Sequence, residues 1–337
     1  MKAIVYKEPQ QIEHPESLFE MQLPDPKPGP DDLLVRVGAV SVNPVDYKIR
    51  QGVTPQTPRV LGWDAVGEVV SVGASVKGFE PGDRVWYAGD LNRAGSNAEL
   101  QCVDARIVSR APTSLSDAEA AALPLTAITA WELLFERLAI KPGKTPTGQV
   151  LLVSGAAGGV GSILLQLASR LTGVTVVATA GRAESRAWVT SLGAHHVVDY
   201  HEPLGPQLAE LGIPAVTHVA SLTHTDVYFP QFVELLAPFG HLALIDDPPS
   251  LDISPMKLRS LSLHWELMFT RSMFNTPDMN AQGRLLAEVA GLVDAGVLRT
   301  TMTQLLGPIS AENLRRGHAL LEKGGGRGKA VLAGFGE

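Results

Sequence analysis

The sequence is poor in residues that cross-link a chain or bind a transition metal. Its 337 residues include one cysteine, Cys102, so no intramolecular disulfide can form, and a structural zinc site built from several thiolates is excluded. Histidine is scarce in the first part of the chain, where His14 is the only one before residue 130. We therefore expect a cytoplasmic protein whose first part lacks the ligands that zinc prefers.

Runs of a single charge are absent as well. The net charge is -7 and no stretch concentrates lysine or arginine, so nucleic acid and anionic membranes are not expected partners. The N-terminal residues 1–10 lack the apolar core of a secretory signal and predict a strand. Residues 149–169 carry no charge, but their glycine-rich centre favours a buried strand, turn and helix over a membrane span. We expect small-molecule partners.

Two hydrophobic patterns predict two domains. Up to about residue 110, short apolar runs alternate with Pro-rich and Gly-rich breaks, which is typical of a β-rich barrel or sandwich. Strand-like and helix-like runs then alternate, with residues 229–240 as one helix, and favour a doubly wound parallel sheet. The last segment breaks this alternation and returns to the first domain. The predicted domains are residues 1–122 with 266–337, and residues 123–265.

The turn "SGAAGGVGS", residues 154–162, lies directly between a strand pattern and a helix pattern. In this context a glycine-rich turn binds a dinucleotide pyrophosphate at a helix N-terminus. Ala156 takes the place of the first fingerprint glycine, and a turn used only for packing is the alternative. The predicted cofactor contacts are Gly155, Ala157, Gly158, Gly159, Val160 and Gly161.

The residues after the second strand of this domain favour NADP(H) over NAD(H). An NAD site usually has an acidic residue at that strand's end. Here Arg182 follows the strand, and Arg186 comes one helical turn later. Two guanidiniums can pair with a 2′-phosphate. The alternative is that both arginines are solvated residues at a helix start.

Four segments together resemble the medium-chain dehydrogenase/reductase superfamily: "SVNPVDYKIRQG", "VLGWDAVGEVVSVGASVKGFEPGDRVW", "LPLTAITAWELL" and "SGAAGGVGS". The chain is most similar to its zinc-independent quinone oxidoreductase branch and to the zinc-type alcohol dehydrogenase-like proteins. The resemblance implies an α/β protein with a GroES-like catalytic domain and a Rossmann domain, often a homodimer. In metal-dependent members a cysteine ligand stands at the position of Asn43, and a histidine ligand falls in the turn that holds Trp63. We therefore expect no catalytic zinc.

Four residues of the first domain are candidate site residues. The resemblance places Asn43 beside the nicotinamide ribose and substrate, with an Asn-Pro turn residue as the alternative. Tyr47 is a candidate proton donor or hydrogen-bond donor to an oxyanion, or else a packing residue. Trp63 forms an aromatic wall for a flat acceptor or packs in the core. Asp64, like the nearby Asp46, either takes part in the chemistry or braces a loop.

Three residues of the second domain complete the predicted cofactor site. By resemblance Thr129 meets the nicotinamide carboxamide, with Thr126 as the neighbouring alternative, and Tyr200 lies near the adenosine phosphate. Ser221 ends the fourth strand, in a turn that also holds His224, where ligands gather in an open α/β sheet.

These features together predict the chemistry. Without a metal, reduction of an activated double bond is less demanding than alcohol oxidation, because hydrogen-bond donors alone can hold the developing enolate oxygen. The resemblance agrees, since zinc-free branches reduce quinones and α,β-unsaturated carbonyls with NADPH. We predict a zinc-independent NADPH reductase of such compounds. The alternatives are a zinc-dependent alcohol dehydrogenase and a non-catalytic NADPH-binding scaffold or sensor.

Overall fold

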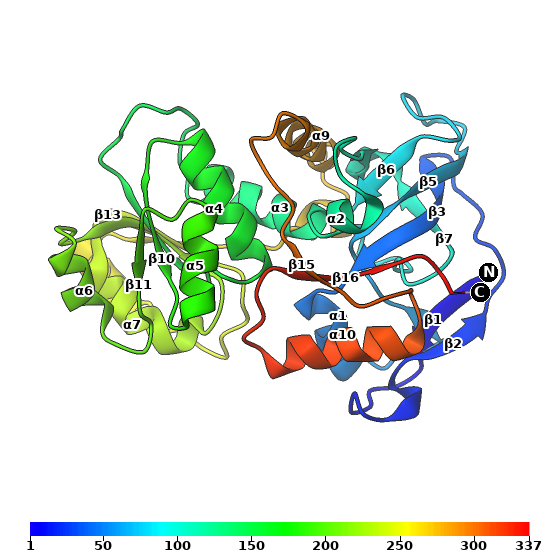
Figure 1. Ribbon diagram of the computed structural model, residues 1–337, viewed down its shortest axis with the longest axis horizontal. Helices are drawn as coiled ribbons and strands as arrows, with labels where there is room; N and C mark the ends of the chain where they lie inside the picture. The colour runs from blue at the N-terminus through cyan, green and yellow to red at the C-terminus, as the bar shows by residue number, and fades with distance from the viewer. Residues whose placement is uncertain (337) are drawn as a thin grey trace. The chain divides into compact units, whose positions relative to one another are not determined.

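The computed structural model describes residues 1–336 and forms two compact units. Unit 1 comprises Met1–Ile128 and Phe269–Glu337, and unit 2 is the continuous segment Thr129–Met268. The chain therefore leaves unit 1, builds unit 2 and returns (Figure 1). The predicted boundaries, after residues 122 and 265, lie slightly earlier in the chain.

Unit 1 is built on a seven-stranded sheet with β3 at its centre. Strand β3 pairs antiparallel with β5, β7 and β16, and along it Leu33, Val35 and Val37 are buried while Arg36 is exposed. This alternation is what a strand with one face on the core requires. The strands are β3 (Asp32–Ser41), β5 (Ala65–Val72), β6 (Arg84–Tyr87), β7 (Leu100–Asp104), β8 (Ser109–Arg110), β15 (Met302–Leu305) and β16 (Lys329–Ala333).

A smaller sheet and several helices complete unit 1. The sheet has the order β2-β1-β4, with bounds Phe19–Gln22, Lys2–Tyr6 and Arg59–Val60. The helices are α1 (Pro44–Gly52), α2 (Asp117–Ala121), α8 (Thr270–Met273), α9 (Ala281–Asp294) and α10 (Ala311–Lys323), with 3-10 turns η1 (Pro15–Ser17) and η2 (Ala105–Ile107). Helix α1 begins at a proline, which tolerates the first helical position because its missing N–H needs no partner there.

Helix α3 (Pro124–Trp131) runs through the boundary between the two units in the sequence and continues as a π-helix, η3 (Glu132–Arg137). The stretch Asp117–Arg137 is long and apolar enough to cross a membrane by composition, but 78% of its most apolar window is buried within the protein. Burial of this kind is typical of a core helix.

Unit 2 is a parallel sheet of six strands in the order β11-β10-β9-β12-β13-β14. The strands are β9 (Val150–Ser154), β10 (Thr175–Thr179), β11 (His196–Val198), β12 (Val216–Ser221), β13 (Leu236–Leu244) and β14 (Ser262–Trp265). The helices are α4 (Gly159–Leu171), α5 (Ala183–Ser191), α6 (Leu204–Glu210), α7 (Thr225–Leu235) and the 3-10 segment η4 (Ser254–Arg259). The predicted doubly wound parallel sheet is confirmed.

The strand order of unit 2 reverses between β9 and β12. From β9 the chain first adds β10 and β11 on one side, and then adds β12, β13 and β14 on the other. Ligands of open α/β sheets bind at the carboxyl ends of the strands beside such a reversal. One local prediction was wrong: the helix expected over residues 229–240 ends at Leu235, and β13 begins at Leu236. Pro238 lacks the N–H that would continue the helix.

Candidate functional site

The glycine turn lies at the reversal of the unit 2 sheet. Gly155 follows β9 with φ +67°, a conformation that favours glycine. A Cβ added to it would approach Thr223 Cγ2 to 2.9 Å, so the turn lies against the segment that follows β12. The ends of β9 and β12 thus come together at the edge of the sheet where ligands of open α/β folds bind.

Gly158 and Gly161 differ in the space that surrounds them. A Cβ on Gly161 would lie 2.4 Å from the carbonyl oxygen of Ala156, so this glycine lets helix α4 pack on the turn. A Cβ on Gly158 would meet only the carbonyl oxygen of Gly155, at 3.4 Å, and otherwise points into open space. Packing within the protein therefore explains Gly161 but not Gly158.

The first turn of α4 fits an anionic group such as a pyrophosphate. The turn residues Ala157, Gly158, Gly159 and Val160 are partly exposed, and α4 begins at Gly159 with Gly158 as its N-cap. The first turn of a helix leaves backbone N–H groups without intrahelical partners, and the helix dipole adds positive potential there. No side chain caps this end of α4.

The two predicted arginines lie at the end of β10 and differ in their surroundings. Arg186 donates from Nη1 to the carbonyl of Ala180 at 3.0 Å and from Nη2 to that of Val197 at 3.1 Å, so its guanidinium ties the ends of β10 and β11 together. Arg182 is exposed and is the N-cap of α5. Of the two, Arg182 is the better placed to meet a ligand from solvent.

His201 is a neighbour of this site that the sequence analysis missed. A Cβ on Gly181 would lie 2.2 Å from the His201 ring, so the imidazole lies directly against the residue before Arg182. Its Nδ1 is 2.7 Å from Asp199 Oδ1, and the Tyr200 ring lies 4.3 Å away between centroids. The predicted Tyr200 therefore belongs to the same corner of unit 2 as Arg182. The only sequence signal was the position of His201 just after the third strand.

The remaining predicted cofactor residues are buried. Ser221 shares a 2.7 Å hydrogen bond with the Thr225 hydroxyl, which also bonds to Asp246 after β13. Thr129 is buried in α3. Thr126 donates to the carbonyl of Leu123 at 3.1 Å within the same helix. These contacts join the ends of β12 and β13, and a direct contact of Ser221 or Thr129 with a cofactor stays a prediction.

In unit 1 the structure brings two predicted residues, Asn43 and Asp64, together with Lys329. Asn43 Nδ2 donates to Asp64 Oδ2 at 2.8 Å. The Lys329 ammonium donates to the same carboxylate oxygen at 3.1 Å and also to Asn43 Oδ1. All three side chains are at most 4% exposed. We call this set the Asn43–Asp64–Lys329 triangle, in which each residue is hydrogen-bonded to the other two.

Both polar atoms of the Asn43 amide have hydrogen-bond partners within the protein. Its oxygen accepts from Lys329, and its nitrogen donates to Asp64 and, at 3.4 Å, to the carbonyl of Ser41. In this arrangement the amide is committed to protein partners, so donation to a substrate carbonyl requires one of these bonds to break. Lys329 itself was absent from the predicted site.

Asp46 lies beside the triangle and is also buried. One of its carboxylate oxygens, Oδ2, accepts from the backbone N–H of Asn43 at 2.6 Å, while Oδ1 has no partner among the described residues. Burial raises the pKa of Asp46 to about 7, an effect opposed by the bond from Asn43 and by the charge of Lys329. The carboxyl therefore changes charge near neutral pH.

Trp63 and Tyr47 occupy different environments. Trp63 is 1% exposed, donates its indole N–H to the carbonyl of Asp90 at 3.2 Å, and packs edge-on against Phe269 with ring centroids 6.3 Å apart. These contacts explain the residue by packing, and a contact with substrate stays a prediction. Tyr47, in contrast, is half-buried on α1.

The donor set of unit 1 does not fit a catalytic zinc. The resemblance implies that the Asn43 amide and the Trp63 indole stand where metal-dependent members of that superfamily have cysteine and histidine, and neither group is a usual zinc ligand. The Asn43 amide is bonded to an ammonium rather than free to face a cation. Within residues 1–336, no group of three or more His, Cys, Asp or Glu is arranged to hold a metal ion.

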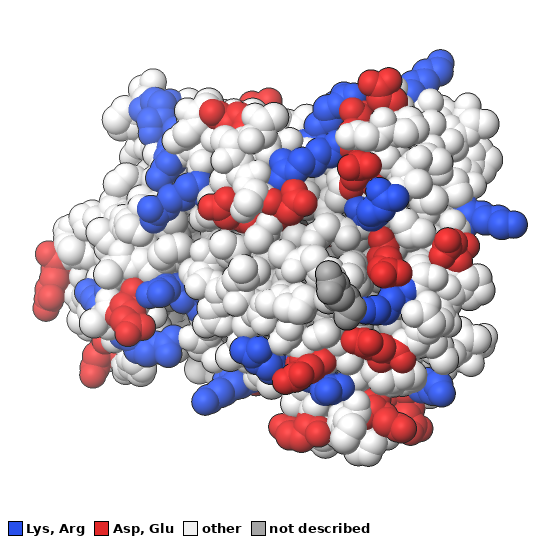
Figure 2. All heavy atoms as spheres, turned by 45° about the vertical axis from the view of Figure 1, so that its right-hand side comes forward, with Lys and Arg blue, Asp and Glu red and all other residues white. Residues whose placement is uncertain are grey.

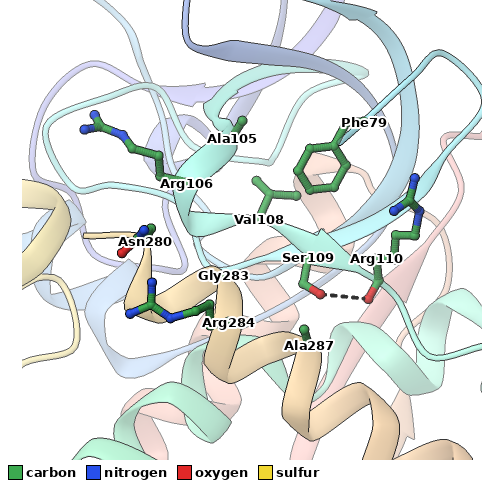
Figure 3. Close-up of a pocket in the computed structure, with 10 residues that line it drawn as sticks. All are labelled: Phe79, Ala105, Arg106, Val108, Ser109, Arg110, Asn280, Gly283, Arg284 and Ala287. Carbon is green, nitrogen blue, oxygen red and sulfur yellow. Dashed lines mark hydrogen bonds between the residues drawn. The ribbon is translucent and has the colours of Figure 1, made fainter. Parts of the chain in front are cut away.

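An open pocket of about 430 Å³ lies elsewhere in unit 1. Figure 3 shows Arg106, Asn280 and Arg284 on one side of it and Phe79 with Arg110 on the other. Two of its arginines are paired with carboxylates: Arg106 with Asp104 at 2.7 Å and Arg110 with Asp83 at 2.8 Å. None of the predicted site residues lines this pocket.

Comparison with known proteins identifies the family of this chain. Residues 29–113 match the alcohol dehydrogenase GroES-like domain, and residues 159–288 match the zinc-binding dehydrogenase family. A zinc-type alcohol dehydrogenase-like protein of Staphylococcus aureus is 41% identical over 335 residues, covering 98% of this chain and 99% of that protein.

Two solved structures share the fold along its whole length. A protein of Rhizobium etli CFN 42, provisionally assigned as a zinc-dependent alcohol dehydrogenase, superposes with a TM-score of 0.96 at 53% identity, covering 100% of this chain and 99% of that one. Escherichia coli quinone oxidoreductase, solved with NADPH, gives a TM-score of 0.84 at 25% identity, covering 99% of this chain and 100% of that one.

Proposed function

Because this chain belongs to the medium-chain dehydrogenase/reductase superfamily, we propose that it is a zinc-independent, NADPH-dependent reductase of quinones or α,β-unsaturated carbonyls. The Asn43–Asp64–Lys329 triangle carries this proposal. In it the Asn43 amide, which by the resemblance stands where metal-dependent members have a cysteine ligand, is hydrogen-bonded to Asp64 and to the Lys329 ammonium. The names of the Staphylococcus aureus and Rhizobium etli relatives favour a zinc-dependent alcohol dehydrogenase instead, so metal dependence is the first property to test.

The cofactor assignment rests on unit 2. The first turn of α4 would hold the pyrophosphate, and Arg182 would pair with the 2′-phosphate that distinguishes NADPH from NADH. Bound NADPH would supply the hydride that adds to the acceptor. The NADPH complex of the Escherichia coli relative supports this choice.

The chain's own task is then to hold the negative charge that develops on the acceptor oxygen. A hydrogen-bond donor aimed at that oxygen lowers the barrier without a metal. Among the predicted unit 1 residues, Asn43 and Trp63 have committed their N–H groups to protein acceptors. We therefore assign this donor role to the half-buried phenol of Tyr47.

We further propose a cytoplasmic homodimer that acts on small molecules. Strand β14 forms one edge of the unit 2 sheet, and its Trp265 is 56% exposed, so a second copy could cover this edge. On the face drawn in Figure 2, basic and acidic residues are interspersed, which does not favour nucleic acid as a partner.

The test is an acceptor panel with the purified full chain. We expect NADPH oxidation with simple quinones and enones, a preference for NADPH over NADH, and no loss of rate after chelation. Alcohol oxidation that chelation abolishes and zinc restores would establish the zinc-dependent alternative. NADPH binding with no turnover across the panel would instead favour the scaffold or sensor.

The role of Tyr47 is tested in the same assay. Tyr47→Phe removes the phenol hydroxyl and should lower kcat at least tenfold while leaving the Kd for NADPH within twofold. An unchanged kcat would remove Tyr47 from the mechanism.

A further inference from the structure

Lys329 is a buried cation whose hydrogen-bonding capacity is completely used. Its side chain is 4% exposed, and its ammonium donates to the carbonyl of Val42 at 2.9 Å, to Asp64 Oδ2 at 3.1 Å and to Asn43 Oδ1. A lysine ammonium has three N–H donors, so each has an oxygen partner. A buried charge held this completely is costly to disturb.

The Asp64 carboxylate is satisfied to the same degree. Besides Asn43 and Lys329, its Oδ2 accepts from the Ser41 hydroxyl at 2.7 Å, and its Oδ1 accepts from the backbone N–H of Leu125 at 2.7 Å. Asp64 therefore receives four donors while it is 0% exposed. Lys329 is the group that supplies the opposite charge.

The triangle joins segments that are far apart in the sequence. Asn43 is the N-cap of α1, Asp64 directly precedes β5, Leu125 lies in the first turn of α3, and Lys329 begins β16. Gly328 makes this last position possible, because its φ is +55° and a Cβ there would lie 2.4 Å from the carbonyl oxygen of Thr301. The backbone thus directs the lysine inward toward the start of α1.

We propose that Lys329 is a positioning residue of the reductase site: its ammonium fixes the Asn43 amide and with it the first turn of α1, which presents Tyr47 to the substrate. This inference rests on the proposed function. Without the ammonium, Asn43 Oδ1 loses its donor and Asp64 remains as a buried carboxylate without a counter-charge. The segment from residue 41 to residue 47 must then rearrange.

The main test replaces the lysine by residues that separate charge from shape. Lys329→Met keeps an unbranched side chain, one heavy atom shorter, but removes the ammonium, and Lys329→Arg keeps the charge. The matched control is Lys323→Met, which removes one exposed lysine from the same unit. Measurements are kcat and KM for a quinone acceptor, the Kd for NADPH from fluorescence titration, and hydrogen exchange of residues 41–52.

For Lys329→Met we expect kcat to fall at least 30-fold, the Kd for NADPH to stay within twofold, and exchange over residues 41–52 to accelerate at least tenfold. The control variant should match the parent protein in all three. A folded Lys329→Met protein with kcat within twofold of the parent and unchanged exchange overturns the proposal. If Lys329→Met does not fold, the double variant Lys329→Met/Asp64→Asn decides in its place: parental kcat and parental exchange in the folded protein overturn the proposal, and a tenfold loss of kcat supports it. Lys329→Arg, which keeps the charge and N–H donors, should retain more of the kcat than either.

A double variant separates positioning from simple charge balance. Lys329→Met combined with Asp64→Asn removes both charges, so a role limited to neutralising Asp64 predicts recovery of both melting temperature and kcat. Positioning predicts that the melting temperature recovers while kcat stays low, because Asn43 Oδ1 still lacks its donor. Recovery of kcat therefore overturns the proposal.

Failure of the proposed function gives a different pattern. If the parent protein oxidises no NADPH with any acceptor, the reductase assignment fails, and hydrogen exchange alone decides whether Lys329 orders the start of α1. Unchanged exchange in Lys329→Met would then overturn that role as well.

Discussion

Replacing Gly158 by alanine should weaken cofactor binding while leaving the fold intact. The added Cβ would contact only the Gly155 carbonyl oxygen, at the ordinary distance of 3.4 Å. Its φ of -70° and ψ of -176° suit alanine. Alanine is a poorer N-cap than glycine, at a cost of about 0.5–1 kcal/mol, but it restricts the unfolded chain by a similar amount, about 0.4–1 kcal/mol. The free energy of unfolding should therefore change by less than about 1 kcal/mol.

The same methyl group would occupy the open space at the N-terminus of α4. Loss of one hydrogen bond to a charged phosphate costs about 1.5–3 kcal/mol, which corresponds to a Kd for NADPH roughly 10–100-fold higher. The matched control is Gly161→Ala, whose Cβ would lie 2.4 Å from the Ala156 carbonyl oxygen. Overpacking of this kind costs about 1–3 kcal/mol or more in stability.

NADPH fluorescence titration and a thermal melt distinguish the two glycines. Gly158→Ala should melt within about 2 °C of the parent and bind NADPH weakly, whereas Gly161→Ala should melt about 5–10 °C lower. A Gly158→Ala protein with both parental Kd and parental melting temperature would show that the space at Gly158 is not used by the cofactor, and the dinucleotide assignment of this turn would then be wrong.

Three further predictions concern stability. Burial lowers the pKa of His318 from 6.5 to about 3, so the unfolded state binds more protons there and the contribution of His318 to the free energy of unfolding falls by about 1.4 kcal/mol per pH unit below pH 6.5. His318→Gln should therefore gain stability relative to the parent in urea titrations from pH 6.5 to 4, and parallel curves would contradict this. Burial raises the pKa of Asp46 from 3.8 to about 7, so its contribution to stability is present below pH 3.8 and is lost as the pH rises through 7. Calorimetry should therefore show that the stability of Asp46→Asn increases relative to the parent between pH 4 and 7. A constant difference would refute the assignment. Trp63→Phe should lower the free energy of unfolding in urea by about 1–3 kcal/mol, because the Trp63 side chain is buried in the core. The KM for the acceptor should change less than threefold. A tenfold rise in KM would place the indole against substrate.

The repeating strands and helices were predictable because their periodicity is local. The unit 2 strands from β9 to β12 and the helices α4 and α5 lie where the hydrophobic pattern places them. The helix expected over residues 229–240 is absent from its last five residues, where the apolar run suits a strand as well as a helix and Pro238 cannot continue the helix. A short apolar run does not by itself distinguish the 3.6-residue period of a helix from the two-residue period of a strand.

The candidate site was predictable only where its residues lie close in sequence. The glycine turn and the arginines after β10 follow a strand and helix that the sequence identifies. Lys329 was missed because its partner Asp64 is 265 residues away in the chain, and no local pattern reports such a contact. The available signal was the position of Lys329 at the start of the apolar run "KAVLAG". If that run is a buried strand, the lysine is buried with it and needs a partner.

The place of β16 between β15 and β3 in the unit 1 sheet has a consequence for biosynthesis. Unit 2 is one continuous segment, so it can fold as soon as it leaves the ribosome. In unit 1, β3 cannot pair with β16, and Asp64 cannot gain the ammonium of Lys329, until residues 329–333 have been translated. During that interval the nascent chain exposes an unpaired strand and a carboxylate that the finished protein buries. Unit 1 is therefore the last part of the molecule to mature and the part most in need of chaperone protection.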